Sequence, residues 1–423
     1  MTSAQSLAAR AVEVLRRNDT GLFVKPGPRV YPFQWNWDSA LIAIGLARVD
    51  PERGRAEVRS LLRGQWTDGM VPHIVFHPQS IDYSPGPEVW ASSECPGAPD
   101  VATSGITQPP VLASAVRALH EADPDRPFLE DVLPAVDAWH RWLERERTFD
   151  DSGLVAIVHP WESADNAPRF DAALARIDPR KLTFTRSDRR HVDAAERPTD
   201  LEYGRYTSIV GQLRDRGYRP RPLSEAPFAY FDLCFNAVLA VAESDLAWLF
   251  GEIGGGGERA AAREARLRVA LAALWDEREA AYRQRDLHGD EGTSDTVADL
   301  FPLYAGVPEE RQARKLLAQA LWSPERFGPS EDSPWAVTTV SKSSPAYDPR
   351  RYWRGPVWIN VNWFLVRGLE RSRLTAEADE LRRLTLRLVE QSGFAEYYHP
   401  STGEPLGSPD FSWSAALTLD LLP

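Results

Sequence analysis

DLCFNAVLAVAESDLAWLFG, residues 232–251, is the stretch from which the fold class is most easily read. Its apolar residues recur at spacings of three and four, which is the period of an α-helix. Asp232, Asn236, Glu243 and Asp245 interrupt the apolar run, so a membrane-spanning helix is not expected here. The stretch therefore predicts a long helix that belongs to a globular protein.

The same helical period continues through most of the chain. It predicts nine further helices, at residues 4–17, 38–49, 53–64, 110–122, 128–146, 258–285, 308–322, 357–370 and 374–391. Strand-like alternation is limited to short pieces such as Met70–Phe76 and Val155–His159. Many helices with almost no strand indicate an all-α fold.

Long segments rich in Pro, Gly, Trp, Tyr and Asp separate these helices. They cover residues 22–37, 65–108, 159–230, 323–356 and 393–411. Segments of this length inside a compact domain are usually functional or disordered, and these are too aromatic for disorder. We therefore expect a helical scaffold on which aromatic-rich loops build a site. The glycine run at residues 254–257 does not have the strand before it and the helix after it that a nucleotide-binding fingerprint requires. It is therefore interpreted as a linker.

The composition excludes several classes of function. The chain has 423 residues, of which 43% are hydrophobic, and its net charge of −12 argues against binding to nucleic acid or anionic membranes. Two isolated cysteines and an N-terminus without the features of a secretory signal predict a cytoplasmic protein. The 15 tryptophans fit either a large core or a sugar site, and composition alone leaves both open.

The segment HPWESADNAPRFD, residues 159–171, holds three carboxyl groups, on Glu162, Asp165 and Asp171. Pro160 and Pro168 keep it out of a regular helix. A carboxyl group on a rigid loop beside Trp and Asn suits a general acid, because partial loss of solvent raises its pKa. The alternative interpretation is that these acids cap helices or pair with arginine.

The segment GFAEYYHPSTGEPLGSPDFSW, residues 393–413, contains the second candidate carboxyl group. Glu396 stands among aromatic residues that would crowd and orient it. Glu404 competes with it, but the surrounding TGEPLG is typical of an exposed turn.

Three further segments carry side chains suited to a sugar. YPFQWNWDSA, residues 31–40, offers aromatic rings together with Gln34 and Asp38, and Asp38 also suits a helix cap. TSGITQPP, residues 103–110, contributes Gln108 at the start of a helix. YDPRRYWRGPVWINVNW, residues 347–363, presents its aromatic residues from a rigid Gly-Pro corner.

Taken together, these segments resemble glycoside hydrolase family 63, in particular its short bacterial branch of mannosylglycerate and glucosylglycerate hydrolases. The resemblance covers nearly the full length. It rests on the motifs QWNWDSA, QWTDGMVPHIVFH, ATSGITQPP, HPWESADNAPRFD, RPTDLEYGRY, YWRGPVWINVNWF and FAEYYHPSTGEPLG, which occur in the family's order. It implies a single (α/α)6-barrel domain over residues 1–423, with cap-forming loops at about 65–108 and 165–230. It also implies inversion at the anomeric carbon and no metal or other cofactor.

The resemblance further implies a role for individual residues. Asp165 matches the family's general acid and Glu396 its general base. The acid loop, WESADN, is one residue shorter than the form found in larger family members. The residues matching the hexose-binding positions, completed by neighbours in the same segments, are Tyr31, Gln34, Trp35, Trp37, Asp38, Gln108, Trp161, Tyr352, Trp353, Trp358 and Trp413. The residues matching the glycerate-binding positions are Tyr83, Arg197 and Tyr203.

The chemistry agrees with this assignment. Inverting hydrolysis needs two carboxyl groups about 6.5–9.5 Å apart, one to protonate the leaving oxygen and one to activate water. Asp165 and Glu396 are far apart in sequence, so only a closed fold brings them together. Arg197 would form a bidentate pair with the glycerate carboxylate.

Several alternatives remain open at this stage. A sugar epimerase on the same barrel would use His399 or His191, a polysaccharide lyase would eliminate, and a carbohydrate-binding protein would not turn over. Other small α-glucosides or α-mannosides are possible substrates, and mannose is not distinguished from glucose. His73 and His77 have helical metal-pair spacing, but their strand-like setting argues against a metal site. Self-association into a homo-oligomer is also possible.

Overall fold

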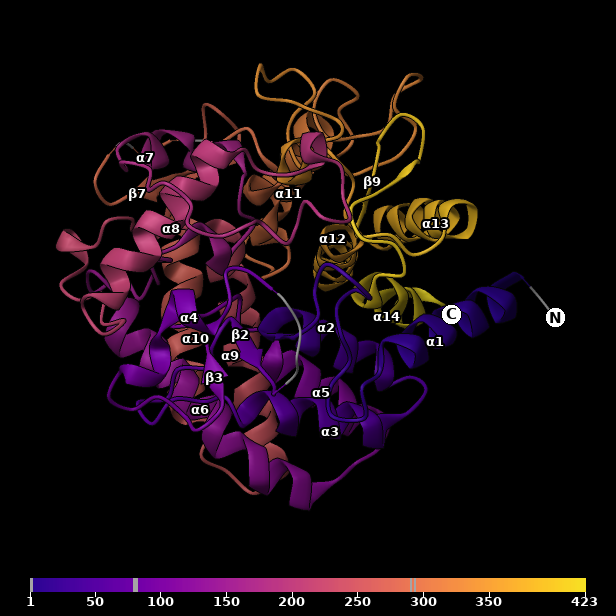
Figure 1. Ribbon diagram of the computed structural model, residues 1–423. Coiled ribbons are helices and arrows are strands. Elements are labelled where there is room, and N and C mark those ends of the chain that lie inside the picture. Colours follow the sequence, from indigo (N-terminus) through magenta and orange to yellow (C-terminus); the bar gives the residue numbers. More distant parts are fainter. Residues whose placement is uncertain (1–2, 79–82, 290, 293) are drawn as a thin grey trace.

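Six helical elements contact one another in a closed ring. A computed structural model describes residues 3–78, 83–289, 291–292 and 294–423. In it α14 packs on α2, α2 on α5, α5 on α9, α9 on η6, η6 on α12, and α12 on α14 (Figure 1). These elements are α2 (Asn36–Leu46), α5 (Leu112–Ala122), α9 (Leu233–Glu252), η6 (Val297–Leu303), α12 (Ile359–Arg371) and α14 (Ser412–Leu421).

The first and last helices of this ring, α2 and α14, are apolar on most of their surface because they are covered on several sides. Every residue of α2 and of α14 is buried. The two helices approach closely at Gly45, where a Cβ atom would lie 2.4 Å from the Cα of Ala416. A side chain at this position would therefore separate the first and last helices of the ring.

A second set of helices lies outside the ring and has one polar face. It comprises α1 (Ser3–Asn18), α3 (Pro51–Leu62), α6 (Arg126–Arg147), α10 (Glu258–Ala273), α11 (Glu310–Leu316) with the wider turn η7 (Leu317–Leu321), and α13 (Thr375–Ser392). Helix α1 packs on α14, α3 on α2, α10 on α9 and α13 on α12. Amphipathic helices of this kind bury one stripe and leave the other in water.

The strands are short and serve to hold loops against the ring. The three sheets with a role near the site are β1 (Gln34–Trp35), β2 (Ile74–Phe76) and β3 (Ala102–Thr103); β4 (Tyr230–Phe231), β7 (Gln284–Asp286) and β8 (Glu291–Gly292); and β9 (Tyr397–Tyr398) with β10 (Pro405–Leu406). All pairings are antiparallel, with Trp35 opposite Ile74 and Val75 opposite Thr103. The fourth sheet is a hairpin of β5 (Trp275–Asp276) and β6 (Ala281–Tyr282).

The long segments between helices contain short elements of their own. These are α4 (Pro87–Trp90), η1 (Ser92–Glu94), η2 (Pro160–Glu162), η3 (Pro168–Phe170), α7 (Asp171–Ala175), η4 (Ala194–Glu196), α8 (Asp200–Arg214), η5 (Leu223–Glu225) and η8 (Tyr352–Arg354). Helix α8 is the substantial one, and it lies inside the predicted loop 159–230. The rest of these segments is irregular, as expected.

The ten predicted helices are all present, with three differences in detail. The helix predicted at 258–285 ends at Ala273, because the residues after it form the β5–β6 hairpin. Asp38 does not cap α2; Trp35 occupies that position and Asp38 lies in the first turn. The predicted strand Val155–His159 forms only isolated bridges, from Val155 to Thr148 and from Ile157 to Tyr230.

Among the described residues, α9 alone is long and apolar enough to cross a membrane by length and composition. Its apolar window is 78% buried within the protein, and it packs on α5, α6, α10 and η6. These are the contacts of a core helix. Cys234 on α9 and Cys95 are both free thiols.

Candidate active site

The irregular segments enclose a pocket of about 840 Å³, a volume that includes the space open to solvent at its mouth. The pocket is lined by Val30, Tyr31, Trp35, Trp37, Asp38, His73, Ile74, Tyr83, Ser84, Pro85, Trp90, Gln108, Trp161, Ser163, Asp165, Asp188, Arg197, Pro198, Tyr203, Tyr352, Trp353, Trp358, Glu396, Phe411 and Trp413. Every predicted site residue except Gln34 is in this set.

Asp165 reaches the pocket from a loop that its neighbours hold in place. Glu162, in the same loop, is fully buried and accepts hydrogen bonds from both terminal nitrogens of Arg147, at 2.7 and 2.8 Å. It also accepts the backbone N–H groups of Thr107 and Val158. Asp171 pairs with Arg354 at the far end of the loop. Of the three carboxyl groups in this segment, only that of Asp165 faces the pocket.

The carboxyl group of Asp165 is buried without a hydrogen-bond donor from any described residue. Asp165 as a whole is 8% exposed to solvent. Burial raises the pKa of Asp165 to about 8; the Arg197 charge opposes this rise and the Glu396 charge adds to it. A carboxyl group in this state holds its proton at neutral pH.

The carboxyl group of Glu396 is also buried, but donors surround it. Tyr31 Oη donates to Oε1 at 2.6 Å, Arg197 reaches both oxygens at 3.2 and 3.4 Å, and the backbone N–H of Ser408 donates to Oε2 at 2.8 Å. Burial raises its pKa above the usual value, although Arg197, Tyr31 and Ser408 act in the opposite direction. These donors favour the carboxylate form.

A glycine makes the Ser408 contact possible. Glu396 directly precedes β9, which pairs with β10, so the chain turns back over the carboxylate. At Gly407, φ is +70° and a Cβ atom would lie 2.5 Å from Glu396 Oε2. Any larger residue here would displace the carboxylate or the backbone donor beside it.

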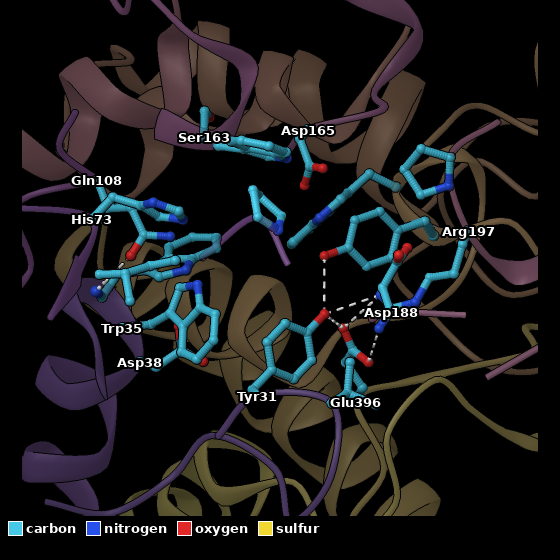
Figure 2. A pocket seen from close by; sticks show the side chains of 18 of the residues that line it. Tyr31, Trp35, Asp38, His73, Gln108, Ser163, Asp165, Asp188, Arg197 and Glu396 are labelled. Atoms are coloured by element: carbon cyan, nitrogen blue, oxygen red, sulfur yellow. Dashed lines mark hydrogen bonds and ion pairs between the residues drawn. The ribbon is translucent and has the colours of Figure 1, made fainter. Parts of the chain in front are cut away.

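Asp165 and Glu396 extend from opposite sides into the same space, as Figure 2 shows. They come from different parts of the chain, the loop before α7 and the segment before β9. The negative charge of Glu396 raises the pKa of Asp165, so the two groups are electrostatically coupled.

Stacked and edge-on aromatic rings form the wall beside these groups. Trp353 and Trp358 stack with their centroids 3.8 Å apart, and Tyr397 stacks on Trp358 at 4.7 Å. Trp37 meets Trp413 edge-on at 5.2 Å. Flat aromatic faces next to two carboxyl groups suit the C–H faces of a sugar ring. Gln108 accepts the backbone N–H of Trp37, which leaves its amide N–H groups for a ligand.

The three residues predicted to contact glycerate all line the same pocket. Tyr83 and Tyr203 belong to its lining, and Arg197 ion-pairs with Glu396 while donating to Tyr31 Oη at 3.0 Å. Arg197 is therefore engaged with the second carboxylate. Its guanidinium also lies 4.8 Å from the centre of the Tyr352 ring.

The prediction that Gln34 contacts the substrate is wrong. Gln34 is fully buried and its amide donates to Glu57 Oε1 at 2.9 Å, while its carbonyl oxygen accepts from Ser60 Oγ and contacts the His77 ring nitrogen. Gln34 and Trp35 are consecutive in β1, and consecutive strand side chains point to opposite faces. Trp35 faces the pocket, so Gln34 faces the scaffold.

Several lining residues were not in the predicted set, among them His73, Trp90, Ser163, Asp188 and Phe411. Asp38 and Asp188 bring the number of carboxyl groups among the described lining residues to four. Burial and the Glu396 charge raise the pKa of Asp38 well above its usual value. Asp188 is held by Arg186. No signal in residues 172–200 distinguishes Asp188, whereas Ser163 and Trp90 lie in segments already singled out.

The two histidines with metal-pair spacing point to different places. His73 lines the pocket and stacks on Trp161, whereas His77 stacks on Phe23 outside it. Within the described part of the chain, no three His, Cys, Asp or Glu side chains are grouped as metal ligands. His191 and His399 are not among the residues that line the pocket.

Comparison with known proteins identifies relatives over the full length. A family model described as "Mannosylglycerate hydrolase MGH1-like glycoside hydrolase domain" matches residues 31–414. The mannosylglycerate hydrolase of Thermus thermophilus is 44% identical, over 97% of this chain and 99% of its own. The glucosylglycerate hydrolase of Mycolicibacterium hassiacum is 37% identical, over 98% of this chain and 97% of its own.

A solved structure agrees with these sequence matches. The crystal structure of GH63 mannosylglycerate hydrolase from Thermus thermophilus, in complex with Tris and D-glycerate, superposes with a TM-score of 0.91. It is 43% identical, and the match covers 98% of this chain and 99% of that one.

Proposed function

The chain belongs to the mannosylglycerate hydrolase MGH1-like glycoside hydrolase family, and from this premise we propose that it hydrolyses mannosylglycerate, glucosylglycerate or both with inversion at the anomeric carbon. It is a glycoside hydrolase of family 63. Within this family we propose its substrate, the stereochemistry of the reaction and the roles of the pocket residues.

The observation that carries the proposal is the contrast between two buried carboxyl groups in one pocket. Asp165 lacks a donor among the described residues and its pKa is raised to about 8, so it supplies a proton as general acid. Glu396 accepts from Tyr31, Arg197 and Ser408, so it stays a carboxylate and acts as general base. An inverting glycosidase needs this pair of protonation states.

The reaction proceeds in one displacement. Asp165 donates its proton to the glycosidic oxygen as the bond from that oxygen to the anomeric carbon breaks, releasing glycerate. A water molecule on the opposite face forms the new bond to carbon and gives its proton to Glu396. The products are glycerate and a hexose with inverted anomeric configuration.

We assign the hexose to the aromatic side of the pocket. Its ligands would be Tyr31, Trp35, Trp37, Asp38, Gln108, Trp161, Tyr352, Trp353, Trp358 and Trp413, all of which line the pocket. The aromatic rings on this side support the assignment, because apolar ring faces suit the C–H faces of a pyranose; Trp358, stacked between Trp353 and Tyr397, holds the Trp353 ring in place.

We assign the glycerate to the side formed by Tyr83, Arg197 and Tyr203. Arg197 has guanidinium donors beyond those it gives to Glu396, and its buried Nε has no hydrogen-bond partner among the described residues. A glycerate carboxylate would take these donors. Arg197 would then bridge the substrate carboxylate and the general base.

We further propose that the chain is a single (α/α)6-barrel domain with caps at about residues 65–108 and 165–230. The closed order of contacts through α2, α5, α9, η6, α12 and α14, with α1, α3, α10 and α13 outside, supports this architecture. Pocket residues Tyr83, Trp90, Asp165, Asp188, Arg197 and Tyr203 come from the proposed caps. The cytoplasmic location and a homo-oligomeric state stay predictions from the sequence.

The test is to incubate the purified protein with each glycerate glycoside and follow the anomeric protons by NMR. The expected result is release of glycerate and initial appearance of the β-hexose from the α-glycoside. Initial α-hexose would overturn inversion, and no release from either substrate would overturn the glycerate assignment. A new double bond absorbing in the ultraviolet would indicate a lyase, and an epimerised glycoside would indicate the epimerase alternative.

A further inference from the structure

The carboxylate of Glu202 collects donors from three separate parts of the chain. It lies in the first turn of α8 with its side chain 12% exposed. Its Oε2 accepts the Thr199 backbone N–H at 2.6 Å and the Thr199 hydroxyl at 2.7 Å, and its own N–H donates to the Thr199 hydroxyl. This reciprocal pattern is a capping box, which explains the position of one carboxylate oxygen.

The other oxygen is directed at the loop of the proposed general acid. Asn166 Nδ2 donates to Glu202 Oε1 at 2.7 Å. Asn166 directly follows Asp165 and has φ of +66°, a left-handed conformation that residues with a Cβ atom rarely adopt. The backbone N–H of Asn166 donates to Tyr206 Oη at 3.1 Å. Two side chains one turn apart on α8 thus hold both the side chain and the backbone of Asn166.

The same carboxylate is joined to the turn that carries Tyr352 and Trp353. Arg351 forms an ion pair with Oε2, and Arg354 approaches Oε1 at 3.4 Å. Tyr352 in this turn contacts Tyr31, the residue that donates to Glu396. Glu202 therefore connects the loop of the acid to the wall beside the base, although it does not line the pocket.

We propose that Glu202 is a positioning residue, which fixes Asn166 and thereby aims the Asp165 carboxyl group at the leaving oxygen. The inference rests on the proposed function. Asp165 receives no side-chain hydrogen bond from the described residues, so its direction is set by its own backbone and by the residue that follows. A misplacement of about 1 Å is enough to reduce a catalytic rate by roughly 10²-fold.

The test compares two leaving groups in the Glu202→Ala variant. Glycerate leaves as an alkoxide and depends on proton donation, whereas fluoride from the matching α-hexosyl fluoride depends on it far less. We expect kcat on the glycerate glycoside to fall about tenfold with little change in KM, a part of the roughly 10²–10⁴-fold that a positioned acid contributes. The rate on the fluoride should change less than about twofold. Glu202→Gln, which keeps an oxygen for Asn166 or for Thr199, should restore most of the loss.

The matched control is Glu404→Ala. Glu404 pairs with Arg350 next to the same turn, whereas Asn166 is held by Glu202 and Tyr206 of α8. This variant should behave as wild type on both substrates. If Glu202→Ala folds poorly, Asn166→Gly provides the same test, since glycine keeps the left-handed backbone and removes only the side-chain contact.

Equal losses on both leaving groups, or a wild-type rate on the glycerate glycoside, would overturn the positioning role. Failure of the proposed function is distinguished from this, because it would show as absence of glycerate release by the wild-type enzyme. In that event the same comparison is made between the fluoride and whichever oxygen-linked α-hexoside the wild type hydrolyses.

Discussion

The surroundings of Asp165 and of Glu396 differ in almost every respect except burial. Both groups lie in the same pocket and are less than one-tenth exposed. Tyr31, Arg197 and the Ser408 backbone donate to Glu396, whereas no described residue donates to Asp165. Burial raises the pKa of both groups, to about 8 at Asp165, while at Glu396 the donors oppose part of the rise.

This difference indicates that hydrogen-bond donors, more than depth or residue type, distinguish the proposed acid from the proposed base. Loss of solvent raises the pKa of any carboxyl group, and donors to the charged form act against that effect. Among the described residues, three donate hydrogen bonds to the Glu396 carboxylate and none donates to the Asp165 carboxyl group. Each of the following changes alters one side of this contrast.

The largest effect is expected from Glu396→Gln, which removes the acceptor for the proton of water. We expect kcat on the natural glycoside to fall by roughly 10³–10⁴-fold, near the upper end for loss of a positioned base. Release of hexose measured by NMR or a coupled assay gives the rate. Retention of more than about a tenth of the wild-type rate would mean that another carboxylate, such as Asp38, is the base.

Asp165→Asn removes the proton donor and keeps the shape of the side chain. We expect a decrease of roughly 10²–10³-fold on the glycerate glycoside, because its leaving oxygen needs a proton. On the α-hexosyl fluoride the decrease should be less than about tenfold, since fluoride departs with little assistance. Similar losses on both substrates would contradict the assignment of Asp165 as the acid.

Tyr31→Phe removes one of the donors to Glu396 and leaves the other two. The Tyr31 contact lowers the pKa of Glu396, so its loss should raise that pKa and move the acidic limb of the kcat/KM profile upward by about 0.5–1 pH unit. The alkaline limb, which reports deprotonation of Asp165 near pH 8, should stay in place. An unchanged acidic limb, or a shift of both limbs together, would contradict the proposed roles of Glu396 as base and Asp165 as acid.

The smallest effect concerns stability. The pKa of Asp165 is raised from 3.8 to about 8 on folding, so between these values the folded state binds a proton that the unfolded state does not. The free energy of unfolding therefore declines as the pH rises through this window, and the decline is complete above pH 8. Asp165→Asn removes this dependence. We expect the Tm of the variant minus the Tm of the wild type to be larger at about pH 9 than at about pH 5, by roughly 2 °C or more. The same Tm difference at both pH values would contradict the raised pKa.

The helices of the scaffold were predictable because their sequences are locally consistent. The prediction at 232–251 matches α9, Leu233–Glu252, where Asp232 caps the helix through the N–H of Phe235. The prediction at 258–285 was too long, since the residues after Ala273 are compatible with helix but pair across the β5–β6 hairpin. Tertiary pairing overrides local preference there.

The two longest helices without a counterpart in the prediction, α8 and α14, were missed for a different reason. Helix α8 contains Gly204 and Gly211 and several β-branched residues, which weaken the helical pattern. The Thr199–Glu202 capping box was present in the sequence as a signal for its start. Helix α14 is buried on all sides, so it lacks the polar stripe that marks an amphipathic helix.

The sequence predicts which residues line the pocket better than it predicts which residues contact one another. The motifs identified residues that line the pocket, with Gln34 as the exception, whose direction is set by the β1–β2 pairing. Which of the three acids in 159–171 faces inward depends on Arg147 and Arg354, which belong to other segments of the chain. The pairing of Arg197 with Glu396 is likewise a property of the folded chain.

The contact of α14 with both α1 and α2 has a consequence for how the protein is made. Five elements of the ring precede α14 in the chain, so α14 is the element that completes the ring. A nascent chain that stops before residue 412 would already carry Asp165 and Glu396, yet α2 and α12 would lack their common neighbour. Such a truncated chain should therefore be open and inactive, and activity should appear only when α14 closes the ring.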